Sequence, residues 1–218
     1  MPNKGTIIWT AILASVAAFL IIPQTHHVFV SATNAHPYIM GFVKFAILSI
    51  MGEYLANRFV HKRWVKVNGL FFKMMIWGIL GVMIVLMFTI FSNGVQGAID
   101  KGVLYIGDTW ASPVIRAFYI SAIMNLTFAP VFMASHRITD VYIDAYASGK
   151  KMSVKEVIVS VDWPGFMSFV IGKTIPFFWI PAHTITFLLP DEYKVIFAAS
   201  LSIVLGLILS YAKLRKTL

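Results

Sequence analysis

Hydrophobic residues along the chain are gathered into six long runs, which short polar segments separate. Each run is close to the roughly 20 apolar residues that a helix needs to cross the hydrocarbon core of a bilayer. The pattern therefore predicts an all-α fold, a polytopic transmembrane helix bundle of about six spans that forms one integral membrane domain over residues 1–218. The predicted spans cover residues 6–30, 38–59, 69–91, 113–135, 163–189 and 195–212.

The composition favours a membrane protein over a soluble one. Hydrophobic residues occupy 59% of the positions and charged residues only 12%, whereas soluble domains carry about 25% charged residues. The net charge of +9 does not indicate nucleic-acid binding, because the basic residues form short clusters between apolar runs and not one basic face. The expected partner is the lipid bilayer, with no nucleic acid. The chain has no cysteine, which excludes disulfides and cysteine nucleophiles.

Basic residues in the loops predict how the bundle sits in the membrane. In a six-span arrangement, twelve of them fall on one side and three on the other. Because basic loops stay in the cytoplasm, both termini are expected to be cytoplasmic, or in the matrix if the membrane is mitochondrial. The first run is expected to remain as a span, since no clear cleavage site follows it. The twelve are Lys4, Arg58, Lys62, Arg63, Lys66, Arg137, Lys150, Lys151, Lys155, Lys213, Arg215 and Lys216, and the three are Lys101, Arg116 and Lys194.

Charged residues inside the apolar runs are the main functional signal. Lys44, Glu53 and Lys173 all have apolar neighbours, and each charge in hydrocarbon costs several kcal/mol, with estimates from about 2.5 upward. Such side chains are expected to face a wet interior or a partner charge, or to extend to the interface. Lys44 lies nine residues before Glu53, so the two point to roughly opposite sides of one helix.

Glu53 and Asn57 are four residues apart and share one face of the second span. Two interpretations of this pair stay open. Glu53 either extends to the membrane interface or pairs there with Arg58 or Lys62, or it lines a cavity inside the bundle, where intramembrane carboxylates are usually found.

Prolines interrupt the fourth and fifth spans. Pro130, Pro176 and Pro181 each remove a backbone donor and leave carbonyl groups free within the membrane. Those carbonyls are satisfied by neighbouring helices or by water in a polar pathway. A packed kink and a polar constriction that includes Lys173 and His183 both fit the pattern.

Other polar residues in the runs have simpler interpretations. Asn125 lies in the middle of the fourth span, where a hydrogen bond to another helix is worth about 1 kcal/mol. His26, His27 and His36 lie at the outer end of the first span and just after it, without carboxylates or thiols nearby. No metal site is predicted there.

No motif of a nucleophile elbow, a phosphate loop or a metalloprotease helix is present. The sequence therefore predicts a protein that is not an enzyme and needs no cofactor. An intramembrane catalytic site built from His183, Glu53 and Asp140 stays a weaker alternative.

Four of the six runs carry segments that match one known pattern in order and spacing. Residues 179–183 (WIPAH) with Thr186 and Phe187, residues 190–195 (PDEYKV), residues 125–132 (NLTFAPVF), and the set Gly41, Gly52, Glu53 and Asn57 make up these segments. They resemble the Mpv–PMP family of small integral membrane proteins of peroxisomes and the mitochondrial inner membrane. The chain departs from that family at Glu53, Met124, His183 and Thr186, where the family has aspartate, an acid and two amides.

The resemblance implies a multi-span helical protein that forms a weakly selective channel or solute pathway. Family members are linked to metabolite and redox balance in organelles. The chain resembles a bacterial-type relative in a cytoplasmic membrane, with an organelle membrane as the alternative.

The leading hypothesis is thus a multi-pass membrane protein that provides a channel or transport pathway for ions or small metabolites. Its alternative is a non-conducting scaffold whose buried polar groups hold helices together. The solute is not predicted, and a homo-oligomer is left open. The proposed lining residues are Glu53, Asn57, Asn125, Lys173 and His183, and the proposed kinks are Pro130, Pro176 and Pro181.

Overall fold

A computed structural model describes the backbone of residues 4–215 and the side chains of residues 4–208. No β-strand occurs among the described residues, which confirms the predicted all-α class. Residue Lys216 and the side chains of residues 209–215, which include Lys213, Arg215 and the end of the sixth predicted span, lie outside the described part of the chain.

Helices account for most of this part of the chain, with short connections between them. The elements in order are α1 (Lys4–Ile21), α2 (Pro23–Ala35), α3 (Pro37–His61), α4 (Leu70–Asp100), α5 (Ser112–Thr127), α6 (Ala129–Ala147), α7 (Val154–Ser160), α8 (Trp163–Gly165), the π-helix η1 (Phe166–Trp179), α9 (Ile180–Leu188) and α10 (Asp191–Arg215).

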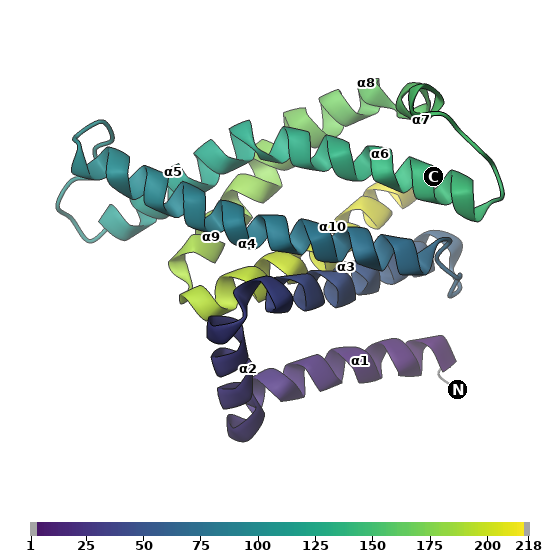
Figure 1. Cartoon of the computed structure of the whole chain (residues 1–218), viewed down its shortest axis with the longest axis horizontal. Coiled ribbons are helices and arrows are strands. Elements are labelled where there is room, and N and C mark those ends of the chain that lie inside the picture. The colour runs from purple at the N-terminus through teal and green to yellow at the C-terminus, as the bar shows by residue number, and fades with distance from the viewer. Residues whose placement is uncertain (1–3, 216–218) are drawn as a thin grey trace.

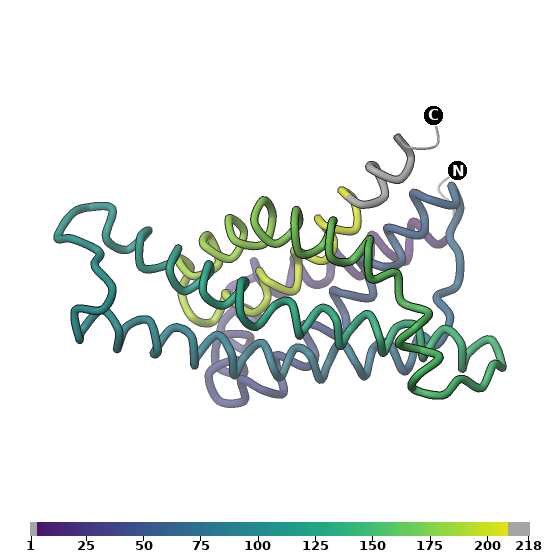
Figure 2. The backbone as a smooth tube through the Cα atoms, turned by 90° about the horizontal axis from the view of Figure 1, so that it is seen from above, coloured from purple at the N-terminus to yellow at the C-terminus, as the bar shows by residue number. Residues whose placement is uncertain are grey.

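The long helices run to and fro along one common axis (Figure 1). α3 and α4 are antiparallel, α5 continues into α6, η1 continues into α9, and α10 leads back towards the end at which α1 begins. The α4–α5 connection projects at one end of the bundle and the α6–α7 connection at the other (Figure 2). Loops that are far apart in the sequence therefore gather at two opposite ends.

Four segments among the described residues are long and apolar enough to cross a membrane. α5 and α6 form a fifth if the bent pair counts as one span; the two helices meet at 47°, two residues before Pro130. The four segments are Lys4–Ile21, Pro37–His61, Leu70–Asp100 and Trp163–Leu188. This result supports a membrane protein, while the number of spans stays a prediction.

The predicted first span, residues 6–30, is divided in the structure. α1 ends at Ile21, and α2 begins at Pro23 and runs across the common axis (Figure 1). Proline has no backbone N–H and is favoured at the first turn of a helix, where that group would have no partner. Pro23 therefore starts a new helix here.

Helix α3 lies between α4 and α10 and approaches both closely through glycine. A Cβ atom on Gly81 of α4 would lie 2.4 Å from the carbonyl oxygen of Gly41, and one on Gly52 would lie 2.9 Å from the backbone of Ser202 on α10. Small residues allow helix backbones to approach in this way in membrane proteins. These contacts fix the three helices around which the site is built.

Twelve of the buried hydrophobic side chains form the main core cluster, which lies between α3, α4, α5, α9 and α10. The helix α1 has no buried residue and is attached mainly by tryptophan. Trp9 Nε1 donates to the carbonyl oxygen of Met51 at 3.0 Å, and Trp64 Nε1 donates to Thr6 Oγ1 at 2.9 Å. The cluster consists of Phe45, Leu48, Met51, Ile84, Phe88, Val95, Ala117, Ile120, Met124, Phe187, Ala198 and Ala199.

Candidate functional site

An ionic cluster joins α3, α4 and α6. The ammonium group of Lys73, whose side chain is 5% exposed, lies 2.7 Å from Glu53, 3.1 Å from Asp144 and 3.5 Å from Asp140. Asp140 and Asp144 are one turn apart on α6 and therefore share a face. Of the partners proposed from the sequence for Glu53, neither Arg58 nor Lys62 is used: its counterion is Lys73.

Lys73 is a functional candidate that the sequence analysis missed. The predicted fourth span ended at residue 135, which left the two aspartates of the cluster in a polar loop, whereas α6 continues to Ala147. The spacing of four residues between Asp140 and Asp144 was the sequence signal that could have indicated a helix with both carboxylates on one face. Only the fold shows that both face a lysine on another helix.

A cavity of about 410 Å³ extends from the ionic cluster into the bundle. We call it the Glu53 cavity. Glu53, Asp140 and His136 lie at one part of its wall, and Asn125 and His183 at another. Its remaining wall is largely aromatic and aliphatic, and includes Phe45, Trp77, Phe128, Phe132, Phe166, Phe169 and Trp179. The cavity is thus an apolar space with a few polar groups at defined places, which is typical of small-molecule sites.

Three buried side-chain polar atoms among the described residues have no hydrogen-bond partner, and all three belong to residues that line the Glu53 cavity. They are Ser49 Oγ, His136 Nδ1 and Trp179 Nε1. Buried polar groups in proteins are nearly always hydrogen-bonded to protein or water. These atoms can therefore bind water or a polar solute inside the cavity.

Asn125 and His183 form a hydrogen-bonded unit between α5 and α9. Asn125 is fully buried, and its amide nitrogen lies 3.0 Å from His183 Nδ1 and donates to the carbonyl oxygen of Ser121 at 2.9 Å. The Ser121 hydroxyl donates in turn to the carbonyl oxygen of Ile180 at 2.7 Å. Pro181 lies in the first turn of α9. The unit holds the imidazole of His183 against α5, and Nε2 of that ring makes no hydrogen bond to any described residue.

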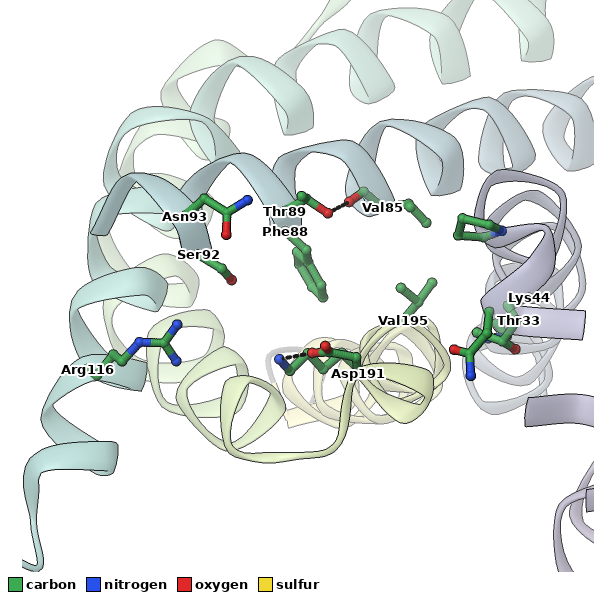
Figure 3. A pocket seen from close by; sticks show the side chains of 13 residues that line it. Thr33, Lys44, Val85, Phe88, Thr89, Ser92, Asn93, Arg116, Asp191 and Val195 are labelled. Atoms are coloured by element: carbon green, nitrogen blue, oxygen red, sulfur yellow. Dashed lines mark hydrogen bonds and ion pairs between the residues drawn. The ribbon is translucent and has the colours of Figure 1, made fainter. Parts of the chain in front are cut away.

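A second cavity, of about 460 Å³, lies towards the end of the bundle that carries the α4–α5 connection. We call it the Lys44 cavity. Its wall contains the basic residues Lys44, Arg116 and Lys194 and one acid, Asp191. Helix α4 contributes Thr89, Ser92 and Asn93, with Phe88 pointing into the space between them and α10 (Figure 3). This cavity is more polar than the other and carries the opposite excess charge.

The two cavities meet at an aromatic partition. Phe88 lines the Lys44 cavity, and its ring lies 5.8 Å from that of His183, which lines the Glu53 cavity. The Phe187 ring lies 4.9 Å from the Phe88 ring. All three side chains are buried. We call these three residues the partition.

Three of the five proposed lining residues, Glu53, Asn125 and His183, line the Glu53 cavity. The other two, Asn57 and Lys173, do not. Asn57 follows Glu53 by one turn but lines neither cavity. Lys173 lies exposed on η1, lines neither cavity and has no ion pair within the described part of the chain. It differs from Lys73 in this respect, although both lysines have apolar neighbours.

The π-helix η1 extends over 14 residues and contains Pro176. π-helical turns are rare and occur often at functional sites. Here the element places Thr174 against the Glu53 cavity while Lys173 faces away. Among the described residues, no group of three or more histidine, aspartate or glutamate side chains is arranged to hold a metal ion.

Comparisons of the chain with protein-family models, with curated proteins and with solved structures found no match.

Proposed function

We propose that the protein is a non-enzymatic, multi-pass membrane protein whose helix bundle forms a weakly selective pathway for ions or small metabolites. The observation that carries the proposal is that the two cavities approach each other at the partition, where Phe88 lines one cavity, His183 lines the other and their rings are neighbours. A pathway needs space from both ends of a bundle, and a constriction of apolar side chains closes such a path by excluding water. The partition is then its closed gate.

The membrane arrangement proposed with this function has six spans and both termini in the cytoplasm. It is supported by the course of the chain, since the α3–α4 and α6–α7 connections lie at the end where α1 begins (Figure 1). Those two connections contain Lys62, Arg63, Lys66, Lys150 and Lys151, and basic loops favour the cytoplasmic side. A bacterial cytoplasmic membrane is the proposed location.

We also propose kinship with the Mpv–PMP family. Its support is that residues of three separate resembling segments, Glu53, Asn125 and His183, line the same cavity. The departures at Glu53 and His183 fall inside that cavity, so the solute of this chain need not be the one that family members carry.

The gate is tested by replacing Phe88 with leucine, which retains apolar packing but removes the ring that touches His183. Purified protein in liposomes is expected to release trapped small solutes faster after Phe88→Leu than in the parent chain. Phe118→Leu is the matched control, because Phe118 is 48% exposed on α5 and is not in the partition. If neither the parent chain nor a folded Phe88→Leu variant passes any solute across gradients, pH values and voltages, the pathway proposal is wrong.

A non-conducting scaffold is the second candidate, and the ionic cluster is the observation that favours it. Lys73 binds carboxylates from both α3 and α6 and so ties three helices together. The substitution Glu53→Gln distinguishes the pathway function from the scaffold function. Altered selectivity in a well-folded variant supports the pathway, whereas lost folding without altered flux supports the scaffold.

A further inference from the structure

Trp179 carries a buried hydrogen-bond donor without a partner. Its Nε1 atom is one of the three buried, unpartnered side-chain atoms of the described residues, and the residue lines the Glu53 cavity. An indole N–H only donates a hydrogen bond, so no change of protonation or tautomer satisfies it, as happens with an amine or an imidazole. A buried donor without a partner costs about 1–3 kcal/mol. Trp179 therefore needs an acceptor that the described residues do not supply.

The ring of His183 presents a second N–H beside that of Trp179. The two rings lie 5.2 Å apart at an angle of 30°. The amide nitrogen of Asn125, which donates to the carbonyl oxygen of Ser121, also lies 3.0 Å from His183 Nδ1 and donates to it. The imidazole proton is then on Nε2, which makes no hydrogen bond to any described residue. Trp179 and His183 thus offer neighbouring donors in one cavity.

The part of the cavity that holds these donors has no ionised side chain in its wall. The charged residues that line the cavity are Glu53, Arg137 and Asp140, and all three belong to the part near the ionic cluster. A charged ligand beside Trp179 would be buried without a partner charge, which is costly. The ligand expected at Trp179 is therefore uncharged.

Aromatic rings surround the donors. Phe128 follows Asn125 by about one helical turn, and its ring lies 5.3 Å from that of Phe132. Both line the cavity, as does Phe169 of η1, and aromatic pairs add about 0.5–1.5 kcal/mol beyond the area that they bury. Phe169 is also 37% exposed, so the cavity lies directly beneath the surface of the bundle, where an apolar molecule arrives from the bilayer. The wall thus favours an aromatic ligand.

We propose that the Glu53 cavity binds an uncharged aromatic molecule with a carbonyl group. The carbonyl oxygen accepts a hydrogen bond from Trp179 Nε1, with His183 Nε2 as the neighbouring donor, and the rings pack against Phe128 and Phe132. A carbonyl fits better than a hydroxyl, because it has two acceptor sites and brings no proton that would itself need an acceptor. This inference goes beyond the proposed pathway and does not rest on it, because it concerns binding and not flux.

The test is isothermal titration calorimetry of the purified full chain in detergent, corrected for titration into detergent alone. Benzophenone is the probe. Diphenylmethane is the matched control, since it has the same two rings and a methylene group in place of the carbonyl. Benzophenone is expected to bind about tenfold more tightly, because diphenylmethane displaces water from Trp179 Nε1 and offers no acceptor in return.

Trp179→Phe tests the donor, because it keeps an aromatic ring and removes the N–H. The ratio of the two affinities is expected to fall from about tenfold to about twofold, since the ligand carbonyl then loses the group with which it interacts. Trp110→Phe is the matched control and should leave the ratio unchanged, because Trp110 is 91% exposed in the α4–α5 connection.

A second variant tests the cavity without touching a donor. Val170 lines the cavity from η1, and Val170→Phe places a ring in the space that the ligand would occupy. Both ligands are expected to bind about tenfold more weakly to this variant. If Trp179→Phe does not purify, Val170→Phe and the affinity ratio of the parent chain decide the question.

Irradiation locates the probe, because excited benzophenone attaches to neighbouring C–H groups and mass spectrometry identifies the labelled peptides. Label is expected in α6, η1 and α9, and to saturate with concentration. The inference is overturned if the folded parent chain does not bind benzophenone, if diphenylmethane binds as tightly, if Trp179→Phe keeps the parent ratio, or if Val170→Phe binds both ligands unchanged. Label that spreads over the outer surface without saturating would also overturn it, and water would then be the partner of Trp179.

This inference and the proposed function fail separately. Trp179 is not part of the partition, and calorimetry in detergent needs no gradient. Benzophenone binding without any solute flux leaves this site and removes the pathway, whereas flux without benzophenone binding leaves the pathway and removes the site.

Discussion

Two lysines within apolar helices, Lys73 and Lys173, have opposite environments. Lys73 is buried against three carboxylates, and Lys173 is exposed on η1 without an ion pair among the described residues. Their sequence neighbours do not distinguish them, because the difference depends on which helix packs against each. Sequence analysis could therefore identify charged residues in apolar runs, and it did so for Glu53, but it could not choose between the lysines.

Replacing Lys73 with methionine is expected to lower the free energy of unfolding by about 3 kcal/mol, the usual effect of leaving one partner of a buried ion pair alone. Glu53, Asp140 and Asp144 would then repel one another without a counterion. Thermal unfolding in detergent measures the change. Lys173→Met is the matched control, with an expected effect within about 0.5 kcal/mol because that side chain is exposed.

A second substitution makes this prediction specific to the cluster. Adding Glu53→Gln to Lys73→Met removes one of the unpaired negative charges, so the double variant should be more stable than the sum of the single effects implies. Additive effects would show that Lys73 stabilises the bundle through packing of its chain and not through charge.

At the scale of elements, the sequence predicted where helices occur better than where they bend. Residues 38–59 correspond closely to α3, whereas residues 6–30 contain the α1–α2 break and the fourth predicted span stops before the end of α6. A hydropathy pattern detects neither a break within an apolar run nor the continuation of a helix into polar residues. A proline such as Pro23 can continue a bent span or start a separate helix. The polar residues after 135 continue α6, where Asp140 and Asp144 contact Lys73 of α4.

The crossing of α3 and α4 provides a prediction at this scale. Gly81→Ala is expected to destabilise the protein, because the new methyl group would meet the carbonyl oxygen of Gly41 at 2.4 Å. Gly97→Ala on the same helix is the control, since nothing lies within 4 Å of its added Cβ, and alanine there should be neutral or stabilising by about 0.5–1 kcal/mol. Unfolding temperatures of the two variants measure the difference. Equal temperatures would mean that the helices can separate at no cost.

The short helix α7 begins with a capping box that makes its order depend on pH. The backbone N–H and the hydroxyl of Ser153 both donate to the Glu156 carboxylate at 2.7 Å, and Glu156 N–H donates to Ser153 Oγ. These bonds lower the pKa of the Glu156 carboxyl. Because the folded pKa is lowered, the stabilisation of α7 is complete above the ordinary carboxyl pKa and is lost as pH falls through the lowered one.

Hydrogen exchange of the α7 amides, corrected for intrinsic rates, measures this effect. Protection is expected to fall on acidification in the parent chain, and to be independent of pH in Glu156→Gln, whose side chain still accepts hydrogen bonds but does not titrate. A parallel loss of protection in both proteins would assign the pH dependence to another group.

At the scale of the whole molecule, the pattern of basic loops and the course of the chain point to the same arrangement. Clusters at residues 58–66 and 150–155 lie at one end of the bundle, and the α4–α5 connection at the other (Figure 2). The partition was beyond sequence analysis for a physical reason. Phe88 and His183 are nearly a hundred positions apart, and no local pattern reports that their rings touch.

This arrangement can be tested directly because the chain has no cysteine, so a single introduced thiol is labelled without background. Lys62→Cys and Lys150→Cys should react with a membrane-impermeant maleimide from one side only, and Val103→Cys only from the other. All three positions are exposed. Oriented vesicles, right-side-out and inverted, give the sidedness of each. Labelling of Val103→Cys and Lys150→Cys from the same side would show that the bent α5–α6 pair enters and leaves the membrane on one face, and the Lys44 and Glu53 cavities would then not lie in series across the bilayer.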